Sequence, residues 1–100
     1  MVKCKILIFP IAQQDLIDII GYLSTLSPQV AIKFFDLITE EISKLSDFLE
    51  RCPLIKDSQL RLRNYRGLKC KNYLIFYVIA GDTVEIRRIL YNRRQYEKLL

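Results

Sequence analysis

A group of cations and phenols near the end of the sequence has the residue types for binding or chemistry at a phosphate. The group lies within ten residues and comprises Arg87, Arg88, Tyr91, Arg93, Arg94 and Tyr96. Two earlier cations, Arg61 and Arg63, are separated by one leucine. Guanidinium groups bind phosphate through paired hydrogen bonds, whereas phenols donate a proton or stack on a base. The group is predicted to be the working surface of the protein.

The charge of the chain is unevenly divided between its halves. The whole sequence has a net charge of +5, but residues 1–50 sum to −3 and residues 51–100 to +8. A positive second half suits an anionic partner such as RNA, DNA or an acidic peptide. A basic half also serves solubility, so composition alone leaves both interpretations open.

Length and composition indicate one globular domain spanning residues 1–100, with 51% hydrophobic and 27% charged residues. Three cysteines without C-x-x-C spacing (Cys4, Cys52 and Cys70) and the absence of histidine indicate neither a disulfide framework nor a zinc site. We therefore expect ordinary thiols, no metal and no cofactor. No apolar run reaches the roughly 20 residues of a membrane helix, and the N-terminus lacks signal-peptide features, so the expected location is the cytoplasm, without a membrane partner.

The cationic group requires a scaffold, and a β-hairpin is predicted to supply it. The apolar run Tyr73–Ala80 reads as one strand and Thr83–Leu90 as the next, with Gly81 taking the positive φ of a tight turn. Alternation assigns the second strand two faces: Val84, Ile86 and Leu90 on one side, and Thr83, Glu85, Arg87 and Ile89 on the other. Arg88 has the wrong parity for the cationic face, unless a bulge redirects it.

The N-terminal half predicts a strand and a helical hairpin. Val2–Phe9 reads as a strand that is buried on both faces from Ile6 onward. An amphipathic helix follows from Ile11 to Leu23, and the pair Ser27-Pro28 starts a longer helix that extends toward Cys52-Pro53.

The second half is predicted to begin with a loop over Leu54–Gln59 and a strand over Leu60–Tyr65 that turns at Arg66-Gly67. Arg93–Leu100 reads as a terminal helix or tail. The order β-α-α-β-β-β-α predicts an α+β domain, in which a helical hairpin covers one face of an antiparallel sheet of about four strands. The other face is expected to be open and to carry Arg61, Arg63, Glu85 and Arg87, with Tyr91, Arg93 and Tyr96 at its edge.

The sequence resembles the RelE/ParE toxins of bacterial type II toxin–antitoxin pairs, also called plasmid stabilisation proteins. The matching segments are Pro10-Ile11-Ala12, Asp15-Leu16, Tyr22, Tyr73-Leu74-Ile75-Phe76-Tyr77-Val78, Val84-Glu85-Ile86 and Arg88-Ile89-Leu90-Tyr91 followed by Arg93. Their order and spacing cover almost the whole chain. The resemblance implies a toxin that arrests growth and is neutralised by a small acidic antitoxin, whose tail lies over the helical hairpin and the sheet.

The resemblance implies two possible activities: ribosome-dependent mRNA cleavage, as in RelE-like members, or inhibition of DNA gyrase, as in ParE-like members. In the endonuclease interpretation, Arg61, Arg63 and Arg87 hold the phosphate and Tyr91 or Tyr96 donates a proton or stacks on a base. The candidate bases are Glu85, Lys69 and Lys71, because arginine does not lose its proton. The residues expected to bind the nucleic acid or the target are Lys69, Lys71, Arg88, Arg93 and Arg94.

Two departures bring the sequence closer to the ParE-like branch. Leu74 stands where family nucleases usually carry an arginine, and Tyr91 stands where many carry a histidine. Tyr96, by contrast, falls near the C-terminal tyrosine of RelE-like enzymes. The same departures support an alternative, in which the chain is an inert module that only binds the antitoxin.

Overall fold

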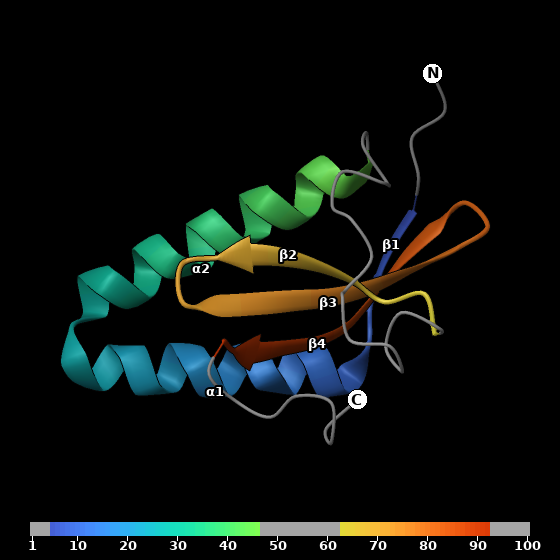
Figure 1. Cartoon of the computed structure of the whole chain (residues 1–100). Helices are drawn as coiled ribbons and strands as arrows, with labels where there is room; N and C mark the ends of the chain where they lie inside the picture. Colours follow the sequence, from blue (N-terminus) through green and yellow to red (C-terminus); the bar gives the residue numbers. More distant parts are fainter. Residues whose placement is uncertain (1–4, 47–62, 93–100) are drawn as a thin grey trace.

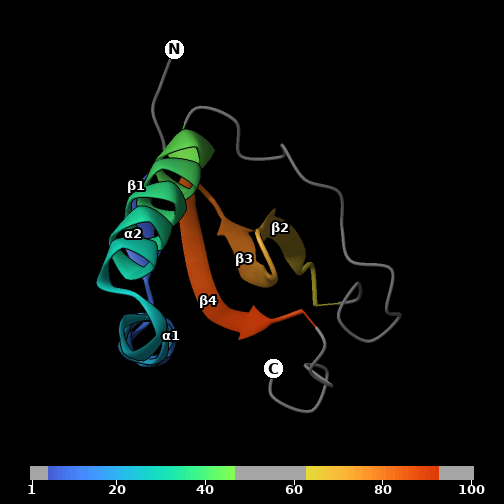
Figure 2. The ribbon, with the colours of Figure 1, turned by 90° about the vertical axis from the view of Figure 1, so that its left-hand side faces the viewer.

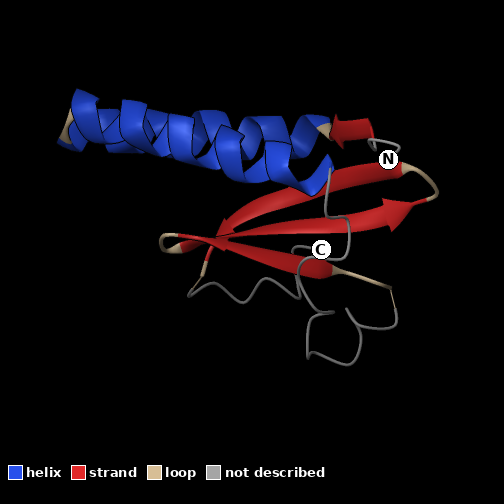
Figure 3. Cartoon of the chain, turned by 90° about the horizontal axis from the view of Figure 1, so that it is seen from above, coloured by secondary structure: helices blue, strands red, loops and turns tan. Residues whose placement is uncertain are grey.

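The computed structural model describes residues 5–46 and 63–92, and it contains a helical layer and a sheet layer (Figures 1 and 3). In chain order the elements are β1 (Lys5–Ile8), α1 (Pro10–Leu26), α2 (Pro28–Ser43), a 3-10 helix (Lys44–Ser46), β2 (Arg66–Cys70), β3 (Tyr73–Ala80) and β4 (Thr83–Tyr91). The predicted α+β class is confirmed, with the helical hairpin on one face of a four-stranded sheet. The predicted C-terminal helix lies outside the described residues.

α2 begins where the Ser27-Pro28 signal places it, and α1 begins at Pro10, one residue before the predicted Ile11. Proline suits a first helical position because the N–H that it lacks would have no intrahelical partner there. Ser27 ends α1 by donating its backbone N–H to the Leu23 carbonyl at 2.9 Å, and its Oγ then caps α2 by accepting from the Val30 N–H at 3.4 Å. One residue thus serves both helices, which keeps the connection short. The predicted extension of α2 beyond residue 46 lies outside the described residues.

The sheet has the strand order β1-β4-β3-β2 and is mixed, whereas a fully antiparallel sheet was predicted. β3 pairs antiparallel with both β2 and β4, but β1 pairs parallel with β4, from Lys5 opposite Thr83 to Ile8 opposite Ile86. Parallel neighbours need a long connection to bring the chain back in the same direction. The helical hairpin and two strands provide that connection.

β1 is an edge strand, and this corrects the prediction that it is buried on both faces. Ile6 and Ile8 pack against the core, but Leu7 between them is 51% exposed. Among the described strands it pairs only with β4, and the side that carries Ile6 and Ile8 faces the helical layer (Figure 2). The apolar run from Ile6 to Phe9 is compatible with an edge strand as well as a central strand, so it did not predict the edge position.

The strand that pairs with β3 lies later in the chain than the predicted strand Leu60–Tyr65, of which residues 60–62 lie outside the described residues, as does the predicted loop Leu54–Gln59. Arg63 and Asn64 form a turn, with Asn64 at φ 61°, and the predicted turn at Arg66-Gly67 is instead the start of β2. The actual turn follows Cys70, and Lys71 there has φ 55°. Pairing with β3 places two apolar side chains of β2 in the core, and this tertiary gain outweighs the local alternation of the preceding segment.

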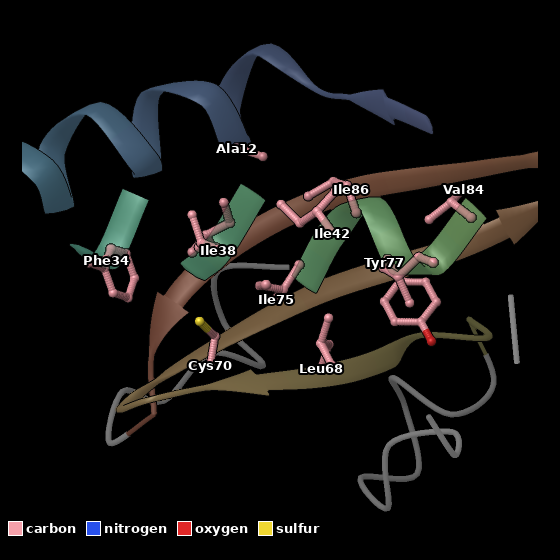
Figure 4. Close-up of a cluster of buried hydrophobic side chains, with 12 residues drawn as sticks. Ala12, Phe34, Ile38, Ile42, Leu68, Cys70, Ile75, Tyr77, Val84 and Ile86 are labelled. Atoms are coloured by element: carbon pink, nitrogen blue, oxygen red, sulfur yellow. The ribbon is translucent and has the colours of Figure 1, made fainter. Parts of the chain in front are cut away.

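The main core lies between the helices and the sheet (Figure 4). Its buried members are Ala12, Phe34, Ile38, Ile42, Leu45, Leu68, Cys70, Ile75, Tyr77, Val84, Ile86 and Ile89. Cys70 is a free thiol whose pKa is raised, first by burial and then by Glu41. It is therefore a small core residue, as predicted, whereas Cys4 and Cys52 lie outside the described residues.

The face of the sheet opposite the helices is not the open surface that was predicted. Tyr65, Phe76 and Leu90 are buried there, with exposures of 3%, 0% and 2%, and Leu74 and Val78 pack against them. Phe76 and Leu90 alternate with the main-core residues along their strands, so they belong to the second face. An apolar cluster occupies much of the surface that was expected to hold cations.

A β-bulge in β4 explains why the predicted faces hold only for the first half of that strand. Tyr77 pairs with Ile86 but Phe76 pairs with Arg88, so Arg87 is the extra residue. Beyond the bulge every residue changes side: Ile89 enters the main core, whereas Leu90 joins the second cluster. The bulge that was considered for redirecting Arg88 is confirmed, and it redirects Tyr91 as well.

The turn between β3 and β4 gives a direct test of backbone conformation. Gly81 has φ +63°, where a Cβ costs about 1 kcal/mol, so Gly81→Ala is expected to lower the free energy of unfolding by about that amount. Gly21→Ala is the matched control, because Gly21 lies inside α1 and a methyl group added there would have no neighbouring atom within 4 Å. It should raise stability by about 0.5–1 kcal/mol. Urea unfolding measures both; a neutral Gly81→Ala would contradict the positive φ.

Neither helix within the described part of the chain is long and apolar enough to cross a membrane.

Candidate functional site

Arg87, a proposed phosphate ligand, is held by two neighbouring side chains. Its Nη2 and Nε donate to Glu85 Oε1 at 2.7 and 3.1 Å, and its guanidinium carbon lies 4.6 Å from the centre of the Phe9 ring. Glu85 was a candidate base, and this contact places its carboxylate in an ion pair. The arrangement ties the bulge to the end of β1 and offsets the cation's charge.

Arg88 joins α1 to the sheet and does not face outward with the other predicted cations. Its Nε and Nη2 donate to the two oxygens of Asp15 at 2.7 and 2.9 Å, and the backbone N–H of Ile89 donates to the same carboxylate at 3.0 Å. The two side chains are only 14% and 12% exposed. The hydrogen bonds that it donates to Asp15 raise the pKa of the Arg88 guanidinium above its usual value, against the opposing effect of burial.

The Asp15 carboxylate accepts a backbone hydrogen bond from β4 that a neighbouring strand would otherwise accept. β1 pairs with β4 only as far as Ile86, and Phe9 adds one last bond to the Ile86 carbonyl at 3.0 Å. Beyond that point the edge of β4 needs another acceptor for the Ile89 N–H, and α1 supplies the Asp15 carboxylate. The sequence placed Asp15-Leu16 among the segments that match the RelE/ParE toxins, without a role for this carboxylate. Its pairing with a residue 73 positions away gave no local signal.

The other predicted cations are dispersed or lie outside the described residues. The Arg63 guanidinium lies 5.1 Å from the centre of the Tyr65 ring, and Lys69 and Lys71 are exposed on β2 and at the turn that follows it. The predicted site residues outside the described part of the chain are Arg61, Arg93, Arg94 and Tyr96. The described cations therefore do not converge on one phosphate-sized site.

Tyr91 lies in a different environment from the one predicted for it. Beyond the bulge it pairs with Tyr73, and the two rings meet edge to face with centres 5.5 Å apart. They border a cavity of about 270 Å³ between α1 and the ends of β3 and β4. The cavity is lined by Asp15, Asp18, Ile19, Tyr22, Tyr73, Ile89, Leu90 and Tyr91. Among the described residues, the side chains that line this cavity around the proposed proton donor are acidic, phenolic or apolar, and none is a cation.

The Tyr73 phenol has a perturbed acidity. Burial raises its pKa above the usual value, and the neighbouring phenols of Tyr22 and Tyr91 raise it further. Its ring also packs against the Phe34 ring, with the two ring centres 5.1 Å apart, and this contact connects the cavity to the core.

The raised pKa of Tyr73 predicts a loss of stability at alkaline pH. Above about pH 10 the unfolded chain releases this proton more readily than the folded protein. The contribution of Tyr73 is therefore complete below that pH and is lost as the pH rises through the folded pKa. Urea unfolding of the wild type and of Tyr73→Phe at about pH 9 and about pH 11 should show the wild type losing more stability. Equal losses in the two proteins would contradict the raised pKa.

The helical hairpin carries an exposed apolar surface that the site prediction did not include. A groove of about 270 Å³ is lined by Ile20, Ser24, Pro28, Ala31, Ile32 and Phe35. Ile32 and Phe35 are 62% and 46% exposed, and Ile17 and Leu26 on α1 are 62% and 64% exposed. Apolar residues at non-core positions of both helices were the available sequence signal. Exposed apolar surface of this kind marks a protein interface.

Among the described residues, no three His, Cys, Asp or Glu side chains are grouped so that they could hold a metal ion. The two acids of the Tyr91 cavity do not reach that number.

Comparison with known proteins identifies both a family and a fold. Residues 6–96 match the family described as the ParE toxin of the type II toxin–antitoxin system parDE. The structure is similar to a solved chain described as the chromosomal ParDE TA system from P. aeruginosa, with a TM-score of 0.74 at 18% sequence identity. That match covers 89% of this chain and 96% of the other. No curated protein matches the sequence significantly.

Proposed function

This chain belongs to the ParE family of toxins from type II toxin–antitoxin modules, and from that premise we propose that it arrests growth by inhibiting DNA gyrase, not by cutting mRNA. It acts in the cytoplasm, and its cognate antitoxin neutralises it by covering the helical hairpin.

The acidic surroundings of Tyr91 are the observation that carries this proposal. RNA cleavage at this tyrosine requires a phosphate beside it, with cations to hold the charge that develops. The described cavity instead brings the Asp18 carboxylate to that position, and its charge repels a phosphate, whereas the charge of Asp15 is offset by Arg88. Among the described residues, the two arginines of the predicted set on β4, Arg87 and Arg88, are bound to Glu85 and Asp15. Inhibition of a protein target requires no such catalytic set.

The exposed groove of the hairpin supports the antitoxin as partner. Ile32 and Phe35 in its lining are 62% and 46% exposed, so a partner that covers the groove removes apolar surface from water. Such a gain favours a protein segment as occupant. Lys69 and Lys71 do not line this groove and are exposed, and we propose them as contacts to the target.

Two parallel measurements test the target. The toxin should inhibit supercoiling by purified gyrase, while induction without antitoxin arrests growth and leaves mRNA 5′ ends unchanged. New 5′ ends at ribosome-bound codons, with normal supercoiling, would overturn the proposal in favour of the endonuclease. Normal growth at high expression of folded protein would instead support the inert antitoxin-binding module.

Variant toxins sharpen this comparison. Lys69→Ala combined with Lys71→Ala should weaken gyrase inhibition, whereas Lys44→Ala serves as a control because Lys44 lies on the 3-10 helix in exposed ion pairs with Glu40 and Glu41. Tyr91→Phe should leave growth arrest intact, because gyrase inhibition requires no proton from that phenol. A loss of arrest in a folded Tyr91→Phe variant would point back to catalysis.

A further inference from the structure

The cavity beside Tyr91 combines acidic, phenolic and apolar side chains. It has a volume of about 270 Å³ and is lined by two carboxylate and three phenol side chains, although the whole chain carries a net charge of +5. Three apolar residues complete the lining. Phenol rings and carboxylates together attract a cation, because the ring faces are electron-rich and the carboxylate is charged.

The two carboxylates have different roles. Asp15 is bound to Arg88 and to the Ile89 N–H, so its charge is offset within the protein. Asp18 is exposed, and its Oδ1 accepts a hydrogen bond from the neutral Gln14 amide at 2.9 Å, which leaves the negative charge in place. Asp18 is therefore the lining carboxylate that can pair with an incoming cation.

The phenols are placed around this carboxylate by three elements, α1, β3 and β4. Tyr22 lies four residues after Asp18 on α1, so both point from the same side of the helix. Tyr91 and Tyr73 face them from the ends of β4 and β3, and Tyr22 and Tyr91 are 60% and 39% exposed. Exposed aromatic rings around an acidic group leave the cavity accessible from solvent.

We propose that this cavity binds an arginine side chain of the antitoxin. A guanidinium is flat enough to stack on a tyrosine ring while it donates two hydrogen bonds to the Asp18 carboxylate, which an ammonium group does less well. The choice of the antitoxin as partner rests on the proposed function, but the choice of a guanidinium rests on the cavity alone. An arginine at this place fixes the register of an otherwise acidic segment on a basic toxin.

A titration with a small probe tests the cavity directly. N-acetyl-L-arginine amide, added to the toxin and followed by backbone amide NMR, should shift the signals of Asp18, Tyr22 and Tyr91 saturably, on the order of 1–10 mM. N-acetyl-L-citrulline amide is nearly the same shape without the charge, and it should leave these signals in place. Equal shifts with both probes, or shifts spread evenly over the protein, would overturn the proposal.

Charge-removing variants test the partner. Asp18→Asn should weaken antitoxin binding about tenfold in a calorimetric titration. Asp36→Asn removes the same charge from an exposed position on α2 and should change the affinity less than about twofold. Equal affinities of the wild type and Asp18→Asn would overturn the proposal. This experiment measures antitoxin binding and not growth arrest or gyrase inhibition, so its outcome tests the arginine site independently of the proposed target.

Discussion

Asp15→Ala is expected to lower the free energy of unfolding by about 3 kcal/mol, more than other single changes of a charged residue described above. The carboxylate accepts two hydrogen bonds from Arg88 and one from the Ile89 N–H, and both charged side chains are at least 86% buried. Removing it leaves a cation and a backbone donor without their acceptor. Each of these groups is costly to leave unmatched in a site shielded from water.

Asp18→Ala is the matched control, because it makes the same substitution on the same helix at an exposed position. It should change stability by no more than about 0.5 kcal/mol. Chemical unfolding of both variants gives the comparison. A double-mutant cycle that adds Arg88→Met should recover part of the loss, because an apolar side chain no longer needs the carboxylate. A loss of less than about 1 kcal/mol for Asp15→Ala would show that the pair does not hold α1 to the sheet.

This prediction also changes what a toxicity experiment on Arg88 can mean. The residue was predicted to contact the target, but its guanidinium is bound within the protein. A loss of toxicity in Arg88→Ala would therefore reflect the fold before any target contact. Measuring unfolding beside growth arrest separates the two effects.

Phe35→Ala is expected to weaken antitoxin binding about thirtyfold, a loss of about 2 kcal/mol. The ring is 46% exposed in the groove between α1 and α2, where an aromatic anchor contributes most when a partner excludes water. The toxin itself loses little, since nearly half of the side chain is already in contact with solvent. Growth arrest should then persist when the antitoxin is co-expressed at a level that protects cells from the wild type.

Glu40→Ala is the control for this change, because Glu40 is exposed on α2 outside the lining of the groove. Its exposed ion pair with Lys44, at 3.8 Å, contributes little. Binding of both variants can be compared by calorimetry, with unfolding as the check on folding. Wild-type affinity in Phe35→Ala would remove this groove from the antitoxin interface.

Local signals predicted the helical hairpin and the central turn. Ser27-Pro28 placed the start of α2 because a side-chain cap and a fixed φ act within one turn of helix. Gly81 placed the β3–β4 turn because glycine, which lacks a Cβ, readily adopts a positive φ, and this preference does not depend on the rest of the fold. The alternation of Val84 and Ile86 predicted the core face of β4 as far as the bulge.

The strand before the hairpin shows where local signals failed. Arg63 and Asn64 in the segment predicted as a strand form a turn, whereas Arg66–Cys70 is a strand because it pairs with β3. Lys71-Asn72, the turn that ends it, was the overlooked signal, because asparagine is frequent in tight turns.

The sequence by itself determined the family, the order of the described elements and the start of α2, since each depends on residues close together in the chain. Only the tertiary structure decided which side chains form the site. One extra residue, Arg87, reverses the faces of β4 and moves Tyr91 to the side of the helices. Asp15 then meets Arg88 across 73 positions. A bulge and a long-range ion pair depend on how β4 packs against β3 and α1, and no pattern within either segment encodes that packing.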